Sequence, residues 1–174
     1  MRLVRYSVAM SLDGFIAGPS GEFDWIPMDP AIDFASFMKK IDTVVMGRRT
    51  FEVAVAHGTA RMPGMRTVVM SRTLRSEDYP DVTISSDAVA ALTSLRAEEG
   101  KDIWLFGGGN LFHDIVAADL VDTVEVGIIP ILLGQGLPLL PTLAKTTKLK
   151  LTHHDVFPTG IVLLRYDVLR GSAA

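Results

Sequence analysis

Residues 103–110 read Ile-Trp-Leu-Phe-Gly-Gly-Gly-Asn, and a helical pattern begins directly afterwards at Leu111-Phe112. This stretch predicts a buried strand, a triple-glycine turn and the start of a helix. The unpaired backbone N–H groups and the dipole of a helix start favour an anion. Glycine lets a phosphate approach the backbone because it has no Cβ. The stretch therefore indicates a site for a phosphorylated ligand, with a purely structural glycine turn as the alternative.

Strand and helix patterns alternate along most of the chain on either side of this turn. Strands are predicted at Leu3–Met10, Thr43–Met46, Arg66–Met70, Val82–Ile84, 102–106 and 121–129. Helices are predicted at 30–41, with Asp29 as N-cap and Pro30 as its first residue, at 49–57, from Ser86-Asp87 to about Glu99, and at 110–117. Such alternation is typical of a largely parallel sheet with helices on both faces.

The end of the chain has a different pattern. After predicted loops at 14–28 and 130–148, the β-rich runs Leu149–Phe157 and Ile161–Leu169 are joined by Pro158-Thr159-Gly160, which predicts a hairpin. The predicted fold class is therefore α/β, with a mixed, mostly parallel central sheet flanked by helices and a C-terminal antiparallel hairpin. The length of 174 residues predicts a single domain over 1–174.

Composition argues against several classes of function. The chain is 48% hydrophobic and 21% charged with a net charge of −3, which is typical of a soluble globular protein. It has no stripe of Lys and Arg, so we expect no nucleic-acid partner. The longest apolar stretch, 126–141, is interrupted by Pro and Gly and is too short for a membrane span. The absence of Cys excludes thiol chemistry and favours a cytoplasmic location.

Three predicted strand ends carry glycine or polar residues: Gly47-Arg48-Arg49-Thr50, Ser71-Arg72 and Gly107-Gly108-Gly109-Asn110. In open α/β sheets, ligands bind at the carboxyl ends of strands. Arg48, Arg49 and Arg72 are suited to phosphates, including a 2′-phosphate, which favours NADP over NAD; solvated surface charges are the alternative. A Rossmann fingerprint is not met, since Phe112 stands where its third glycine should be, and no P-loop sequence is present.

These motifs together resemble the dihydrofolate reductase-like family. The resemblance rests on residues 44–52, 68–72, 103–110 and 7–16, and on their order, their spacing and the closing hairpin. Within that family, the chain is most similar to the reductase domain of RibD and its stand-alone relatives. This closer likeness rests on Ser11-Leu12-Asp13-Gly14, on residues 129–136 and on residues 157–160.

The resemblance implies NADPH as the cofactor. By position, it implies that Ala9, Asp13 and Gly14 border the nicotinamide. It implies further that the phosphates and the adenosine side contact Gly47, Arg48, Arg49, Thr50, Ser71, Arg72, Gly107, Gly108, Gly109, Asn110 and Leu111.

The resemblance also identifies candidate substrate residues. Asp33 stands where dihydrofolate reductases keep their pterin-binding carboxylate, one helical turn before Phe37, and a partly buried carboxylate there can orient or protonate a substrate. The alternative is an Asp that complements the helix dipole. Trp25 either caps the substrate pocket or is a core aromatic. The expected catalytic residue is thus Asp33, and the expected substrate contacts are Trp25, Asp33 and Phe37.

The predicted function is NADPH-dependent reduction of a pyrimidine- or pteridine-like compound, such as a ribosylamino-pyrimidine phosphate. Folate reduction is one alternative, although Met65 stands where folate enzymes place an arginine and Arg66 comes one position late. A nucleotide-binding protein without turnover is another. We expect no metal site, because the adjacent His153 and His154 point to opposite faces of a strand. The resemblance implies a homodimer.

Overall fold

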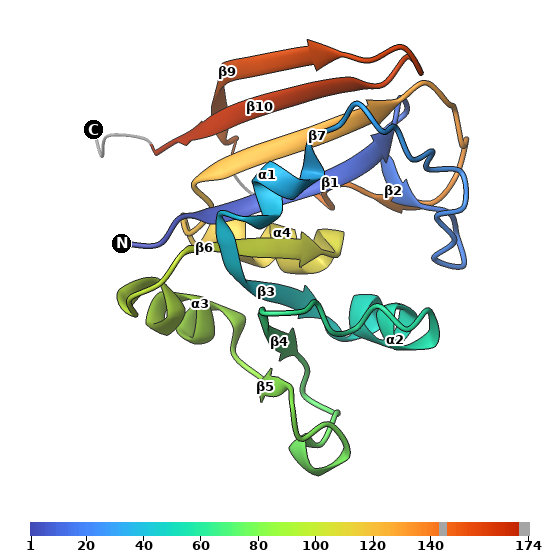
Figure 1. Ribbon diagram of the computed structural model, residues 1–174. Helices are drawn as coiled ribbons and strands as arrows, with labels where there is room; N and C mark the ends of the chain where they lie inside the picture. Colours follow the sequence, from blue (N-terminus) through green and yellow to red (C-terminus); the bar gives the residue numbers. More distant parts are fainter. Residues whose placement is uncertain (143–145, 171–174) are drawn as a thin grey trace.

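The computed structural model describes residues 1–142 and 146–170 (Figure 1). Its main sheet is eight-stranded, in the order β5-β4-β3-β6-β1-β7-β10-β9. The strands are β1 (Val4–Ser11), β3 (Ile41–Gly47), β4 (Arg66–Met70), β5 (Thr83–Ser85), β6 (Asp102–Gly107), β7 (Thr123–Ile129), β9 (Lys148–Val156) and β10 (Val162–Leu169). A second, two-stranded sheet pairs β2 (Phe15–Ala17) with β8 (Leu137–Pro138).

The strand directions confirm the predicted fold class. From β5 to β7, every neighbouring pair in the sheet is parallel. Strand β10 is antiparallel to both of its neighbours, β7 and β9. Strands β9 and β10 close the sheet at the top of Figure 1. Because the parallel strands share one direction, their carboxyl ends lie along one edge of the sheet, where ligands bind in open α/β folds.

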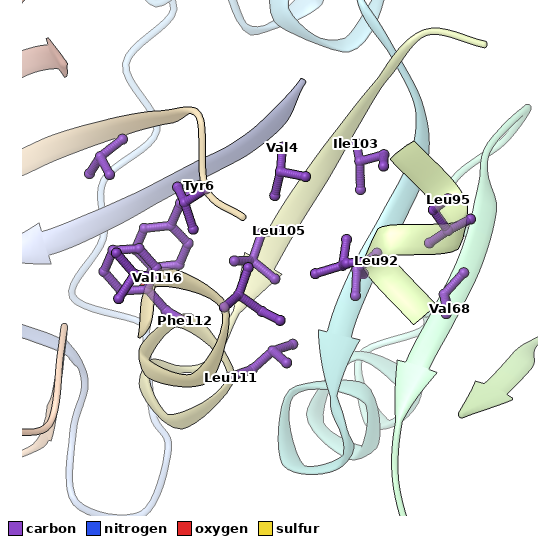
Figure 2. Packing of buried hydrophobic residues seen from close by; sticks show 14 of the residues in the cluster. Val4, Tyr6, Val68, Leu92, Leu95, Ile103, Leu105, Leu111, Phe112 and Val116 are labelled. Atoms are coloured by element: carbon purple, nitrogen blue, oxygen red, sulfur yellow. The ribbon is translucent and has the colours of Figure 1, made fainter. Parts of the chain in front are cut away.

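Four α-helices and one 3₁₀ turn are present in the described residues. They are α1 (Phe34–Met38), α2 (Arg48–Ala56), η1 (Ser76–Asp78), α3 (Ala88–Ala97) and α4 (Gly109–Ala117). Figure 2 shows apolar side chains of α3 and α4 packed against alternate residues of the strands. The intervening strand residues pack with α1 and α2 on the opposite face. The helices therefore cover both faces, as the alternating pattern predicts.

The start of α4 is anchored to β1 by an aromatic pair. The ring of Tyr6 stacks on that of Phe112, with centroids 3.8 Å apart and planes 7° from parallel. Both residues are buried in the larger core cluster. Burial raises the pKa of the Tyr6 hydroxyl well above its ordinary value. The pair fixes the helix that follows the triple glycine, so the position of the turn depends on the core beneath it.

The helix predicted over 30–41 is wrong in extent. The observed α1 is short, and its N-cap is Asp33, whose carboxylate accepts from the backbone N–H of Ser36 at 3.0 Å. Asp29 is not a helix cap, since its carboxylate accepts from the N–H of Ala31 at 2.8 Å and from the hydroxyl of Thr159 at 2.5 Å. Ile41 belongs to the core of β3. The apolar periodicity of 30–41 runs through α1 into β3, so it predicts one helix where the structure has a short helix and the start of a strand.

The predicted loops are also corrected in part. The segment 14–28 contains β2, and the segment 130–148 contains β8 and the first residue of β9. These two short strands pair with each other, so the loops are joined rather than independent. The other predicted elements are confirmed, with ends that differ by about two residues or fewer.

Candidate functional site

Two helix N-termini lie side by side at the carboxyl edge of the sheet. Helix α2 begins after Gly47 and α4 begins after Gly108, and neither N-cap forms a side-chain capping bond. A Cβ built on Gly47 would lie 3.9 Å from the carbonyl oxygen of Gly107, and one built on Gly108 would lie 3.6 Å from Thr50 Oγ1. We call this place, formed by Gly47, Thr50, Gly107 and Gly108, the glycine crevice. Two positive dipole ends converge there, which suits an anion.

The topology supports this position. From β3 the chain passes through α2 to β4 on one side, and from β6 it passes through α4 to β7 on the other side of β1. The glycine crevice therefore lies at a reversal of strand order, where open α/β sheets bind ligands. The peptide bond between Gly107 and Gly108 is cis, and Gly107 has a φ of +140°, which favours glycine.

The third glycine has a different role from the first two. A Cβ on Gly109 would lie 2.6 Å from the carbonyl oxygen of Pro138 and 3.1 Å from that of Leu139. Gly109 is thus required by packing against the end of β8 and the residue that follows it. Of the following predicted residues, Asn110 is exposed, whereas the Leu111 side chain is buried in the core. Leu111 therefore offers only its backbone to a ligand.

Arginine side chains lie beside the glycine crevice. Arg48 donates to Glu52 at 2.8 Å, one turn along α2. Arg49 and Arg72 are exposed, and neither has a hydrogen bond or ion pair with the described residues. The Ser71 hydroxyl accepts from the N–H groups of residues 73 and 74 at 3.1 and 3.0 Å, so it shapes the turn that carries Arg72. Arg49 and Arg72 are the side chains available to pair with phosphate.

The sheet opens between β1 and β6 next to this crevice. The register between these strands ends at the Tyr6–Leu105 pair, although β1 continues to Ser11 alongside β7. Ala9 pairs with Gly127 on the β7 side. In the described residues, the other backbone edge of β1 around Ala9 thus has no strand partner. Such an edge requires hydrogen-bonding partners from solvent or from a polar ligand.

The turn at Asp13 is bound to the loop at 131–134. The Asp13 carboxylate accepts from the Ser11 hydroxyl at 2.6 Å and from the backbone N–H groups of Leu133 and Gly134 at 3.1 and 2.7 Å. These bonds, the one from Ser11 first, hold the pKa of Asp13 below its ordinary value. Gly14 follows with a φ of +93°. Asp13 therefore joins two loops at the carboxyl edge, a contact that the sequence did not indicate.

A cavity of about 200 Å³ lies on the other side of β1, between α1 and the strands β7, β10 and β9. Its lining comprises Ala31, Ile32, Asp33, Phe34, Phe37, Glu125, Asp155, Phe157, Leu163 and Arg165. We call it the carboxylate cavity. Two of the three predicted substrate residues, Asp33 and Phe37, line it together. Trp25 lies outside this lining, and its indole N–H donates to the carbonyl of Glu22 at 3.2 Å.

Asp33 is an exposed N-cap, so the expectation of a partly buried carboxylate is wrong. Hydrogen bonds from Ser36, from its hydroxyl first and from its backbone N–H second, hold the pKa of Asp33 below its ordinary value. The carboxylate is therefore ionised at neutral pH and acts as a hydrogen-bond acceptor facing the cavity. Asp33 therefore has the geometry of a helix-start Asp, which was the alternative interpretation. A catalytic role for Asp33 stays a prediction.

Glu125 and Arg165 are cavity residues that sequence analysis did not assign to the site. They are opposite each other in the β7–β10 register and form an ion pair between Arg165 Nε and Glu125 Oε2. Glu125 also accepts from the Ser7 hydroxyl at 3.3 Å. The available signal was a charged residue within each of two mainly apolar strand patterns. Such a residue is expensive to bury unless it is paired.

The third carboxylate of the cavity, Asp155, pairs with His153 Nε2 at 2.8 Å. No group of three or more His, Asp or Glu side chains within residues 1–142 and 146–170 is arranged to hold a metal ion. In the same part of the chain, no helix is both long enough and apolar enough to cross a bilayer.

A mostly parallel sheet that opens between β1 and β6, with two helix N-termini at its carboxyl edge, is the fold of the dihydrofolate reductase-like class. Within this class, the chain belongs to the RibD C-terminal domain family, whose model matches residues 2–163. The resemblance stated from the sequence is thereby confirmed.

Individual relatives agree with this assignment. The chain is 32% identical over 177 residues to the uncharacterized protein YyaP of Bacillus subtilis (strain 168), covering 95% of this chain and 94% of YyaP. Its fold matches the crystal structure of a putative riboflavin biosynthesis protein from Shewanella sp. PV-4, with a TM-score of 0.83, 26% identity and coverage of 98% and 100%. Dihydrofolate reductase from Enterococcus faecalis, complexed with NADP(H), shares the fold at a TM-score of 0.68 and 19% identity, with coverage of 95% and 96%.

Proposed function

We propose that the protein is an NADPH-dependent reductase of a small pyrimidine- or pteridine-like substrate. The family supports an oxidoreductase of the pyrimidine reductase type. The observation that carries the proposal is that β1, which has no strand partner on its β6 side around Ala9, lies between the glycine crevice and the carboxylate cavity. A cofactor in the former and a substrate in the latter would meet at Ala9.

The geometry of the strands supports this meeting point. Ser7 and Ala9 on β1 pair with Glu125 and Gly127 on β7, so the four residues form two rows on one face. Glu125 lines the cavity, and the row of Ala9 and Gly127 lies about 7 Å further toward the carboxyl edge. That row carries no large side chain. A flat ring beside the cavity would lie against Ala9.

The residues of the glycine crevice fit a dinucleotide. Gly47, Gly107 and Gly108 would hold the pyrophosphate at the two helix starts, and Arg49 and Arg72 would pair with phosphates on the adenosine side. When bound, NADPH supplies the hydride, while the protein orients the reactants and excludes water. Asp33 would accept a hydrogen bond from the substrate across the cavity. This arrangement excludes competing ligands of the wrong shape rather than adding chemistry of its own.

Arg66 gives no support to folate reduction. It lies at the start of β4, at the amino edge of the sheet, and pairs with Glu98 at 3.1 Å. The carboxylate cavity lies across the sheet between α1 and β7, β10 and β9. Arg66 is therefore not a partner for the tail of a folate, and the small cavity is the part of the site that selects the substrate.

Titration with NADPH by calorimetry, with NADH as the comparison, tests the proposed function. We expect NADPH to bind in the micromolar range and more tightly than NADH, because Arg49 and Arg72, which have no ion pair with the described residues, lie beside the crevice. Absence of binding by either nucleotide below millimolar concentration would rule out the reductase and leave only the fold.

We further propose that the protein is a homodimer. Strand β9 is the last strand of the main sheet, and it exposes Leu149, Leu151 and Val156. An edge strand that exposes apolar side chains is prone to pair with another chain unless it is covered. Light scattering coupled to gel filtration measures the mass directly. Replacing Leu151 by Lys should shift a dimer toward monomer without loss of NADPH binding, and a monomeric mass for the unaltered protein contradicts the proposal.

A further inference from the structure

The carboxylate cavity contains one guanidinium, and its position is set by the sheet. Arg165 lies on β10 directly opposite Glu125 of β7, and its Nε donates to Glu125 Oε2. The other oxygen of Glu125 accepts from the hydroxyl of Ser7, on the next strand. The chain of contacts crosses β1, β7 and β10. Arg165 is therefore held by strand register and not by a loop.

A local irregularity of the hairpin also affects the position of Arg165. The register between β9 and β10 shifts between Arg165 and Tyr166. The hydroxyl of Thr152, on β9, donates to the backbone carbonyl of Arg165 at 3.1 Å. β-Bulges redirect side chains, and they are frequent beside binding sites. The extra residue of the bulge is Thr152 on β9, and it lies opposite Arg165, whose side chain lines the cavity.

The outer part of the guanidinium is available to a ligand. The Arg165 side chain is 41% exposed and lines the cavity, and its terminal nitrogens have no acceptor among the described residues. Arginine has five N–H donors in a planar fork, of which Nε carries one. The remaining donors face a space that a substrate would occupy. An oxygen acceptor on that substrate would replace the water that solvates them.

The surrounding charges select the kind of oxygen. Asp33, Glu125 and Asp155 also line the cavity, so three carboxylates accompany the single guanidinium. A phosphate or carboxylate on the ligand would be repelled by these like charges, whereas a neutral carbonyl oxygen would not. The apolar walls, which include Phe34 and Phe37, favour a flat ring.

We propose that Arg165 is a specificity-determining residue that donates to a ring carbonyl oxygen of an uncharged, flat heterocycle, and that Glu125 positions it. The proposal rests on the proposed function in one respect, that the carboxylate cavity is where the substrate binds. Asp33 then accepts a hydrogen bond from a donor on the ring, and Arg165 donates one to a carbonyl oxygen of the same ring.

Two pyrimidines that carry either oxygen or amino groups at the same two ring carbons test this role. The probes are 5,6-diaminouracil and 2,4,5,6-tetraaminopyrimidine, in which amino groups replace both carbonyls, at a pH where both rings are uncharged. Calorimetry is performed on the protein saturated with NADPH, so that the glycine crevice is filled. We expect Arg165→Met to weaken binding of 5,6-diaminouracil by about tenfold or more and to change that of tetraaminopyrimidine by less than about twofold.

Arg66→Met is the matched control, because Arg66 is 45% exposed and also pairs with a glutamate, but at the amino edge of the sheet. It should change neither affinity. If Arg165→Met does not fold, Arg165→Lys replaces it; this variant keeps the charge without the fork, and a severalfold loss specific to 5,6-diaminouracil is expected.

The proposal is overturned by equal losses for both probes, by no loss for either, or by failure of 5,6-diaminouracil to bind the unaltered protein. It is also overturned if inorganic phosphate binds the NADPH complex in a manner that Arg165→Met abolishes. NADPH affinity is measured separately. If NADPH does not bind, the probes are titrated on the protein alone, and the reductase proposal fails while the role of Arg165 is still decided.

Discussion

The glycine crevice and the carboxylate cavity lie on opposite sides of β1, and they are built by different means. The crevice consists of backbone groups and glycines from two strand–turn–helix units, β3–α2 and β6–α4. The cavity consists of side chains from four separate segments, held together by strand register and by α1. A phosphate can be bound by local backbone geometry, whereas recognition of a ring requires side chains from several elements.

If this division holds, a change in the cavity should alter turnover and leave cofactor binding intact. Asp33→Asn is expected to produce the largest effect, a fall in turnover of roughly 10² or more with unchanged NADPH affinity, because the charged acceptor is lost while the cap can persist. Steady-state oxidation of NADPH with a reducible substrate, together with calorimetry, measures both quantities.

Asp87→Asn is the control for the loss of a capping carboxylate. Asp87 caps α3 by accepting from Ala90 N–H at 2.9 Å, far along the chain from the cavity. Asp87→Asn should leave turnover unchanged.

The rate should also depend on pH through Asp33. Since the pKa of Asp33 is lowered, the rate should lose no Asp33-dependent component until the pH falls below about 4. A weakened NADPH affinity in Asp33→Asn would show that the two sites are not separate.

The next largest effect is expected in the crevice and compares neighbouring glycines. Gly108→Ala places a methyl group where only Thr50 Oγ1 is near, at 3.6 Å, so the fold should tolerate it while the close approach of a phosphate is blocked. We expect NADPH affinity to fall by about tenfold or more with little change in Tm. Calorimetry and thermal melting separate the two readouts.

Gly109→Ala should show the opposite pattern. Its Cβ would lie 2.6 Å from a backbone oxygen of Pro138, so the fold must shift, at a cost of about 1–3 kcal/mol. A lower Tm is therefore expected. If Gly109→Ala melts like the unaltered protein, or if Gly108→Ala binds NADPH normally, the assignment of different roles to the two glycines is wrong.

The same contrast explains what could be predicted from the sequence. The glycine crevice depends on residues that are adjacent in the chain, so Gly47-Arg48 and Gly107-Gly108 were found with the strands that precede them. Most elements were found for the same reason, since apolar periodicity is local. The helix at 30–41 was overextended because Phe34, Phe37 and Ile41 have helical spacing although Ile41 is in β3.

The missed features all depend on long-range contacts. Glu125 and Arg165 meet because β7 and β10 pair in one register. Asp29 does not cap a helix, and its carboxylate accepts a hydrogen bond from the hydroxyl of Thr159 on the hairpin turn. No spacing rule brings residues 29 and 159 together. Asp33 and Phe37 line one cavity, as their spacing of one helical turn and the family resemblance predict, and their contact with a substrate stays a prediction.

A smaller effect is expected from the cation on the adenosine side of the crevice. Arg72→Ala should weaken NADPH by about tenfold and NADH much less, since a charge-assisted bond to a 2′-phosphate exists only in NADPH. Arg61→Ala is the control, because Arg61 is paired with Asp81 at 2.5 Å. Competitive fluorescence titration gives both constants. Equal losses for the two nucleotides would remove Arg72 from this role.

The smallest effect is expected at Asp13, which belongs to neither region but ties the two loops at their shared edge. Because hydrogen bonds from Ser11, Gly134 and Leu133 lower its pKa, ionised Asp13 stabilises the folded state above its ordinary pKa, near 4, and this contribution is lost as the pH falls through the lowered value. Asp13→Asn should therefore melt below the unaltered protein at pH 7, and the Tm difference should shrink as the pH falls below about 4.

NADPH affinity in Asp13→Asn should fall by only about twofold, since the loops retain the backbone bond from Leu12 N–H to the carbonyl of Ile131 at 2.9 Å. A Tm difference that is constant from pH 7 to pH 3 would mean that the carboxylate charge does not hold the loops. A large loss of NADPH would mean instead that Asp13 contacts the cofactor, as the family resemblance implies, and that the crevice extends across β1 into the loops.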